Sequence, residues 1–255
     1  MPVNKIVDSF DEAIKDVSDG AVILLGGFGN PGACPTWLIK ALEKKGTKEL
    51  TVVGNTPGLG SAMINVMRKM GAVAMMPDWF DDGGILAANG QVKHSICSFP
   101  VSPSPAVKTA FEVALEKKEM TVELLPQGTL AERCRAAKMG IAAFYTPTGP
   151  GTVIADGKEV REFNGRPHVL EHAIEADFSF IRAHKADRRG NLIFRGTSRT
   201  LNAAFAGAAK VNIVEVDEVV ELGELNPEHI VTPGIWVDRI VARPKEGWVK
   251  EVQKW

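Results

Sequence analysis

Four glycines lie within seven positions directly after the apolar run AVILL (21–25): Gly26, Gly27, Gly29 and Gly32. Glycine loses more conformational entropy on folding than any other residue, so such a cluster needs a physical reason. Backbone amides without neighbouring side chains can stabilise an oxyanion that develops on a reacting carbonyl. We therefore interpret residues 26–32, the glycine loop, as a candidate oxyanion site that needs a nucleophile nearby. A tight structural turn is the alternative.

Nucleotide-binding motifs are a second interpretation of the glycine loop. Residues 27–32 match the bare spacing of G-x-G-x-x-G. That fingerprint also needs an acidic residue at the end of the following strand, where this chain has Gly54 and Asn55, and Pro31 is awkward inside the turn. No Lys-Ser/Thr pair follows as a phosphate-binding P-loop requires. We expect no permanently bound nicotinamide or nucleotide cofactor.

Other reactive side chains give weaker signals. The segment His168–His172 reads H-x-x-E-H, a zinc-peptidase pattern whose two histidines would share a helix face, but a downstream acidic ligand is missing. We therefore expect no metal. Cys34 follows the glycine loop at an expected helix start, where a thiol pKa can fall; we interpret it mainly as pocket lining. Cys97 and Cys134 are expected to be buried.

Two arginine-containing segments, 187–191 and 195–199, concentrate positive charge around a turn and a helix start. They could receive a carboxylate or a phosphate, or form a structural group of ion pairs. No G-x-S-x-G nucleophile elbow is present in the sequence.

Composition limits the class of protein. The 255 residues carry a formal net charge of −1, so no broad basic field attracts nucleic acid or an anionic membrane. The apolar runs are far shorter than the ~20 residues that span a bilayer. Three scattered cysteines and the absence of a secretory pattern at the start favour a cytoplasmic location. We expect one domain over residues 1–255.

Strand-like and helix-like segments alternate along the chain. Strands are expected at 21–25, 49–55, 121–125, 141–145 and 210–220, with a long strand, turn and short strand over 176–194. Helices are expected near 9, over 35–45, 61–73 and 105–118, and from a capping box at Thr129–Glu132 to Gly140. A further strand is expected after 73, and 77–105 is expected to be loop-rich.

Residues 152–166 predict an antiparallel hairpin around Asp156-Gly157, with another turn at Asn164-Gly165. The fold class predicted is α/β: an open, mostly parallel sheet flanked by helices, with a small antiparallel patch at its edge. In such sheets ligands bind at the carboxyl ends of the strands, where the glycine loop and Asn55 are expected.

Four long segments carry a family resemblance: DGAVILLGGFG (19–29), 120–152, 176–202 and 214–241. Together they resemble the A (alpha) chain of the family I CoA-transferases, in the 3-oxoacid (succinyl-CoA type) branch. The resemblance covers roughly residues 19–55 and 106–241. It implies the open α/β sheet of that family, which is related to sugar-phosphate isomerase and sensor domains.

The resemblance also implies a chemistry. CoA moves from an acyl-CoA to a free carboxylic acid, so CoA is a substrate. The nucleophile that attacks the thioester is a glutamate on a homologous B subunit, and an A2B2 heterotetramer is implied. The A subunit supplies the oxyanion loop, here Gly26, Gly27, Phe28, Gly29 and Gly32. We assign Asn30, Cys34 and Asn55 to substrate binding.

The sequence departs from the family pattern at three points. Pro35 comes one residue later than in the motif GGF-x-x-x-G-x-P, Thr56 replaces a second Asn, and 56–105 lacks the usual GEN-containing pattern. Altered pocket loops are compatible with a CoA-thioester hydrolase or decarboxylase on the same fold. A ligand-binding module without catalysis is the alternative from another class, and it would not need an oxyanion loop.

Overall fold

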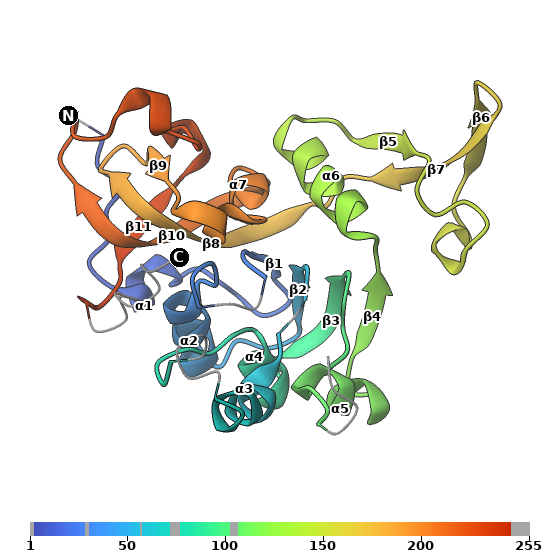
Figure 1. Ribbon diagram of the computed structural model, residues 1–255, viewed down its shortest axis with the longest axis horizontal. Helices are drawn as coiled ribbons and strands as arrows, with labels where there is room; N and C mark the ends of the chain where they lie inside the picture. The colour runs from blue at the N-terminus through green and yellow to red at the C-terminus, as the bar shows by residue number, and fades with distance from the viewer. Residues whose placement is uncertain (1–2, 29–30, 57, 72–76, 103–106, 246–255) are drawn as a thin grey trace.

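The computed structural model describes residues 3–28, 31–56, 58–71, 77–102 and 107–245. Its main sheet has the order β11-β10-β8-β1-β2-β3-β4, with all neighbours along this path parallel. The short β9 pairs with β8 in the antiparallel sense. The predicted open, mostly parallel sheet is confirmed (Figure 1).

The bounds of the main-sheet strands follow. They are β1 (Val22–Leu25), β2 (Leu50–Gly54), β3 (Val92–Cys97), β4 (Thr121–Leu124), β8 (Ala176–Asp187), β9 (Leu192–Ile193), β10 (Ala209–Val220) and β11 (Arg239–Ala242). The longest two, β8 and β10, pair over almost their whole length. They form the half of the sheet that lies beside β1.

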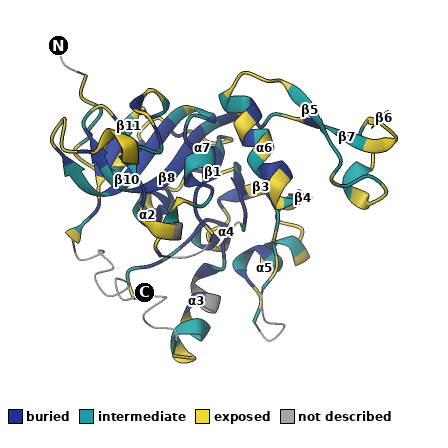
Figure 2. Cartoon of the chain, turned by 45° about the horizontal axis from the view of Figure 1, so that its top comes forward, coloured by how far each residue is buried: buried dark blue, intermediate teal, exposed yellow. Residues whose placement is uncertain are grey.

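Helices cover both faces of this sheet because strand residues point alternately to the two sides. On one face Ile23 and Leu25 of β1 pack in a cluster with α1 (Phe10–Ala13), α2 (Thr36–Lys45), α3 (Gly60–Lys69), α4 (Gly84–Ala88) and α5 (Ala110–Glu116). On the other face Leu24 packs in a second cluster with α6 (Gln127–Lys138) and α7 (Asn202–Phe205). Figure 2 shows the strands as the buried centre of the molecule.

Several element predictions are confirmed. Ser9 caps α1 by accepting a hydrogen bond from the Glu12 N–H at 3.1 Å. Gly140 follows α6 with φ +69°, and the N–H of Ile141 donates back to Ala136 at 2.9 Å, as a helix-ending glycine predicts. Short 3₁₀ turns complete the described secondary structure: Val153–Ala155, Gly196–Arg199, Pro227–His229 and Gly234–Trp236.

Other predictions were wrong. The segment 77–105 is not loop throughout, because it contains α4 and β3; polar Lys93, His94 and Ser95 hide the strand pattern of β3. Thr129 does not cap a helix, because α6 has already begun at Gln127 after Pro126. The strand predicted after 73 falls mainly on residues 72–76, which lie outside the described residues.

The antiparallel patch is a sheet of its own and not an edge of the main sheet. It has the order β5-β7-β6, with β5 (Ala143–Thr146), β6 (Val160–Phe163) and β7 (Arg166–His172), and it projects from the body in Figure 1. The hairpin turn is Asn164-Gly165, where both residues have positive φ. Asp156-Gly157 follows a 3₁₀ turn instead, so the hairpin predicted there was wrong.

Candidate functional site at the carboxyl edge of the sheet

The glycine loop begins where β1 ends, at the carboxyl edge of the sheet. The next strand, β2, ends beside it: a Cβ on Gly54 would lie 3.2 Å from the carbonyl oxygen of Leu25. The loop then runs into α2, whose first helical residue is Thr36. The predicted location of the loop and of Asn55 at strand ends therefore agrees with the fold.

Close packing explains two of the glycines. A Cβ on Gly26 would overlap Oδ1 of Asn202 so closely that no side chain fits there. Gly27 has φ +94°, and a Cβ there would lie 2.8 Å from the carbonyl oxygen of Ala33. The two limbs of the loop are thus pressed together, with Asn202 beside them.

The amide of Gly26 is already used, because its N–H donates to the carbonyl oxygen of Phe180 on β8 at 2.9 Å. Among the described residues, the N–H groups of Gly27, Phe28 and Gly32 donate to no protein group. Phe28 is 36% exposed and Gly32 is exposed. Gly29 and Asn30 lie outside the described residues. The amides open to a ligand therefore belong to the later part of the loop.

Cys34 lines a small hollow together with Gly26, Gly27, Thr56 and Asp82. The hollow has a volume of about 10 Å³, which is room for one water molecule. Cys34 is buried, and this burial, with the nearby Asp82 and Glu215 charges, raises the pKa of its thiol well above the usual value. The thiol is protonated at neutral pH, so the structure gives no support to Cys34 as a nucleophile.

Asn55 is buried at the end of β2 and turned toward α6. Its backbone oxygen accepts from the N–H groups of Ser98 and Phe99, both at 2.9 Å. Its side-chain oxygen accepts from Nε2 of Gln127 at 2.7 Å. These contacts tie three chain segments together at the carboxyl edge, and Asn55 does not line the small hollow beside Cys34.

Asp82 was missed by sequence reasoning. Its carboxylate is buried and accepts hydrogen bonds from the N–H groups of Leu59, Gly60 and Gly84 at 2.7, 3.0 and 3.0 Å. Burial raises the pKa of Asp82, although these three donors oppose the effect. The residue joins the starts of α3 and α4 next to Gly27, so it is a structural support of the site.

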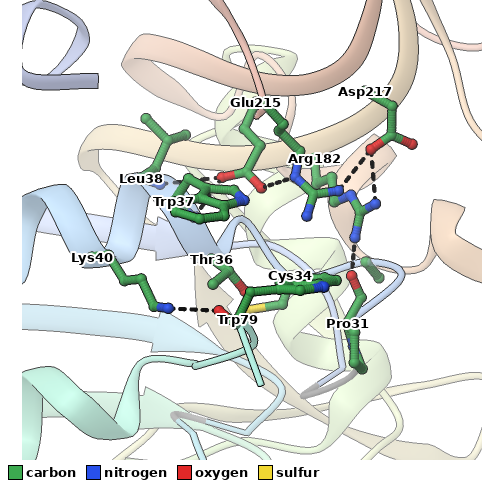
Figure 3. Close-up of polar contacts among 12 residues, drawn as sticks. Pro31, Cys34, Thr36, Trp37, Leu38, Lys40, Trp79, Arg182, Glu215 and Asp217 are labelled. Atoms are coloured by element: carbon green, nitrogen blue, oxygen red, sulfur yellow. Dashed lines mark hydrogen bonds and ion pairs between the residues drawn. The ribbon is translucent and has the colours of Figure 1, made fainter. Parts of the chain in front are cut away.

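A buried ion-pair network lies beneath the glycine loop (Figure 3). It consists of Arg182 on β8, Glu215 and Asp217 on β10, and Arg243 just after β11. Arg182 contacts Asp217 at 2.9 Å, and Arg243 contacts Asp217 at 2.7 Å and Glu215 at 2.8 Å. The ring of Trp79 lies 4.8 Å from the Arg243 guanidinium. Pairing of each charge offsets the cost of its burial.

The network holds both ends of the loop segment. Glu215 accepts hydrogen bonds from the N–H groups of Trp37 and Leu38 in the first turn of α2, at 2.8 and 3.1 Å. Arg182 donates to the carbonyl oxygen of Pro31 inside the loop. A carboxylate at a helix N-terminus also interacts favourably with the helix dipole. The network therefore fixes the loop relative to β8, β10 and α2.

The two carboxylates of the network have opposite pKa shifts. Burial raises the pKa of Glu215 even though Arg243 and Arg182 oppose the shift. Burial acts in the same direction on Asp217, but the hydrogen bond with His184 and the charges of Arg182 and Arg243 outweigh it and lower the pKa of Asp217 well below its usual value. Asp217 is therefore a firmly ionised partner of both guanidinium groups.

Sequence reasoning missed Arg182, Asn202 and Glu215 as supports of the site. A signal was present for two of them, because Arg182 and Glu215 each interrupt an apolar strand, FSFIRA and NIVEV. A charge inside a buried strand needs a partner, and here the partner is the network. Asn202 gave no such signal, since it lies after an exposed turn.

The zinc-peptidase interpretation is not supported. His168–His172 lies on strand β7, so its residues do not share a helix face. Glu171 is buried and pairs with Lys158 at 2.8 Å. Among the described residues, no group of three potential ligands could hold a metal ion. The arginines of segment 187–199 are split between a turn after β8 and the 3₁₀ turn before α7.

The larger hollow of about 250 Å³ lies at the opposite, amino edge of the sheet, where Asp19, Asp177 and Lys210 line it. Asp177 and Lys210 form an ion pair across it at 2.8 Å. It is therefore separate from the glycine loop. Of the helices in the described residues, none is long and apolar enough to cross a membrane.

A parallel sheet covered on both faces, with a glycine loop at its carboxyl edge, defines an α/β protein that binds its ligand at that edge. A family model described as Coenzyme A transferase matches residues 7–243. The chain is 42% identical over 240 residues to the A subunit of 3-oxoadipate CoA-transferase from Pseudomonas putida, with 94% of each chain covered. It is 44% identical over 239 residues to the A subunit of a probable succinyl-CoA:3-ketoacid coenzyme A transferase from Bacillus subtilis (strain 168), covering 94% and 90%.

Solved structures agree on the fold. The acyl-CoA transferase (YdiF) apoenzyme from Escherichia coli O157:H7 superposes with a TM-score of 0.77 at 24% identity, over 96% of this chain and 48% of that one. The chain belongs to the coenzyme A transferase family. The predicted resemblance to the A subunit of the 3-oxoacid branch and the predicted enzyme class are confirmed.

Proposed function

We propose that this chain is the A subunit of a two-chain enzyme that moves CoA from succinyl-CoA, or a similar acyl-CoA, to a 3-oxo acid. The names of its relatives support this substrate class: one acts on 3-oxoadipate and the other on a 3-ketoacid. Both acceptors are 3-oxo acids. CoA enters and leaves as part of the substrates and is not a resident cofactor.

The proposed chemistry balances without an oxidant or water. The nucleophile is a glutamate carboxylate of the B subunit. It attacks the thioester carbonyl, the C–S bond breaks, and CoA leaves as a thiolate with an acyl-glutamyl anhydride behind it. The thiolate then attacks the glutamyl carbonyl and releases the donor acid as its carboxylate, which leaves a glutamyl-CoA thioester. The 3-oxo acid carboxylate reverses the two steps and leaves as its CoA thioester.

This chain contributes the oxyanion loop in the proposal. Each attack places negative charge on a former carbonyl oxygen, and fixed amides stabilise that charge without reorganising. The observation that carries the proposal is the placement of the glycine loop: exposed Gly32 and Phe28 at the carboxyl edge, above a buried network that fixes the backbone. Phe28 supplies an apolar wall that helps to exclude water from the reacting thioester.

The hollow under the loop is too small for a thioester, since about 10 Å³ holds one water molecule. The acyl group must therefore bind over the exposed side of the loop, where a second chain can cover it. The assembly in the proposal is a heterotetramer with two A and two B subunits. Both relatives are named as one of two kinds of chain, which supports the existence of the partner.

Borohydride trapping tests the proposed reaction. The complex with its cognate B subunit is incubated with succinyl-CoA and then treated with borohydride, which reduces a glutamyl thioester to the alcohol. Mass spectrometry of the digest should find the reduced glutamate in the partner chain and only after incubation with the acyl-CoA. Turnover of the acyl-CoA without any trapped glutamate would favour hydrolysis or decarboxylation in place of transfer.

A further inference from the structure

The peptide bond between Pro31 and Gly32 is fixed from below. The Arg182 guanidinium, which is 5% exposed, donates to the carbonyl oxygen of Pro31. Asp217 holds the other end of that guanidinium at 2.9 Å. The carbonyl of Pro31 therefore points into the protein, toward β8 (Figure 3).

The N–H of Gly32 must then point the other way. In a trans peptide the C=O of one residue and the N–H of the next lie on opposite sides of the C–N bond. Gly32 is exposed, whereas its neighbours Pro31 and Ala33 are buried. Its amide is therefore directed from the buried guanidinium toward the exposed side of the loop.

The peptide on the far side of Gly32 is fixed as well. The carbonyl oxygen of Ala33 accepts a hydrogen bond from Nδ2 of Asn202 at 2.9 Å, and the same nitrogen donates to Ser198 at 2.9 Å. Oδ1 of Asn202 accepts from the backbone N–H of Arg182 at 3.0 Å. Both peptide planes that flank Gly32 are held by buried side chains which contact each other.

The charge on Arg182 adds to the effect of its position. A cation bound to a peptide oxygen polarises the peptide group and strengthens its N–H as a donor. An oxyanion on the exposed side of the loop would gain from that polarisation without contacting the guanidinium. The paired Asp217 keeps the buried arginine in place.

The geometry points to the N–H of Gly32 as the oxyanion donor of the glycine loop, with Arg182 and Asn202 as the positioning residues that aim it. This inference rests on the proposed function, which needs an oxyanion site but does not say which amide provides it. Gly26 is excluded because its N–H is bonded within the sheet.

Two substitutions at Gly32 test the donor in the complex with the B subunit. Gly32→Pro removes the N–H, whereas Gly32→Ala keeps it and adds a side chain at an exposed position. We expect kcat of Gly32→Pro to fall about 10²-fold or more below that of Gly32→Ala, the usual effect of losing one oxyanion donor. KM for succinyl-CoA should differ less than about threefold between the two variants because the donor acts mainly on the transition state. Equal kcat values for the two variants would overturn the inference.

Substitutions at Arg182 test the positioning role. Arg182→Gln should lower kcat by about 10-fold or more with little change in KM, and Arg182→Lys, which keeps the cation, should recover part of the loss. Arg239→Gln is the matched control, because Arg239 also donates to a backbone carbonyl and pairs with an aspartate, at Ala13 and Asp16 on the far side of the sheet. It should retain kcat.

The readouts separate this inference from the proposed function. Wild-type transfer and the trapped glutamate report on the proposed function alone. If both are present and kcat falls equally in the Gly32→Pro and Gly32→Ala variants, the function stands and the donor assignment fails. If Arg182→Gln does not assemble with the partner chain, the Gly32 pair still decides the question.

Discussion

Oδ1 of Asn202 occupies the place that a Cβ of residue 26 would take, although the two residues are far apart in the chain. The space that glycine leaves open is therefore filled by the side chain that also holds the far limb of the loop through Ala33. Gly26 serves close packing, and its N–H serves the sheet. The glycines of this loop thus have different roles despite their proximity.

Gly26→Ala should destabilise the chain. The new methyl group overlaps Asn202 and the Phe180 carbonyl, and overpacking of this kind costs about 1–3 kcal/mol. Gly128→Ala is the control, since a Cβ there meets nothing within 4 Å and alanine favours the helix α6. Urea unfolding should show a lower midpoint for the first variant and an equal or higher one for the second. An unchanged midpoint for Gly26→Ala would show that the loop packs differently.

Glu215→Gln should be far more damaging than a surface substitution of the same type. It leaves Arg182 and Arg243 with Asp217 as the remaining carboxylate of the network, and loss of one partner from a buried pair costs about 3–5 kcal/mol. Glu12→Gln breaks the exposed pair with Lys15 and should cost less than about 1 kcal/mol. Comparable losses in the free energy of unfolding would contradict the network as described.

Asp217 should contribute to the loss of stability in acid. Its pKa is lower in the folded protein than the value near 3.9 of an unfolded chain, so its ionised form stabilises the fold above that pH. That contribution is lost as the pH falls from about 4 toward the folded-state pKa. Asp217→Asn should therefore show a flatter decline in the free energy of unfolding between about pH 5 and pH 3 than the wild type.

A surface variant calibrates the acid profile. Asp78 has a fully exposed side chain, and Asp78→Asn should follow the wild-type curve. Wild-type and Asp217→Asn curves that stay parallel over the whole range would argue against the ionised Asp217 as a stabilising partner.

The three cysteines should resist alkylation in the native protein. Cys34, Cys97 and Cys134 are all buried, and burial raises the pKa of each thiol, to about 11 for Cys97 and about 12 for Cys134. Because the thiolate is the reactive form, iodoacetamide should label them slowly at about pH 8 and rapidly after unfolding. Mass spectrometry of timed digests measures both rates. Fast native labelling of Cys34 would reopen its role as a nucleophile.

The sequence predicted the layers of the fold well, because apolar runs such as AVILL alternate with helical patterns and this alternation is typical of a parallel sheet. It failed where local patterns compete with tertiary context. The strand β3 contains Lys93, His94 and Ser95 in succession, which breaks the apolar signal that buried strands usually show. Thr129 matches a capping box, yet the helix begins earlier, where Pro126 precedes it.

The site was predictable in location but not in its supports. The composition of the glycine loop marks it in the sequence, and the end of an apolar strand places it at the carboxyl edge. Arg182 and Asn202 contact the loop although they are distant from it in the chain, by 151 residues for the Pro31 contact and 169 for the Ala33 contact. Contacts over such separations depend on the strand order β10-β8-β1, which no local pattern specifies.

The most direct test of the account is the activity of the chain with and without its partner. The cognate B subunit, this chain and the two together are assayed with succinyl-CoA and a 3-oxo acid, and the new acyl-CoA is measured by chromatography. The account predicts transfer only when both chains are present, because the loop and the attacking glutamate belong to different polypeptides. Full transfer by this chain alone would contradict it.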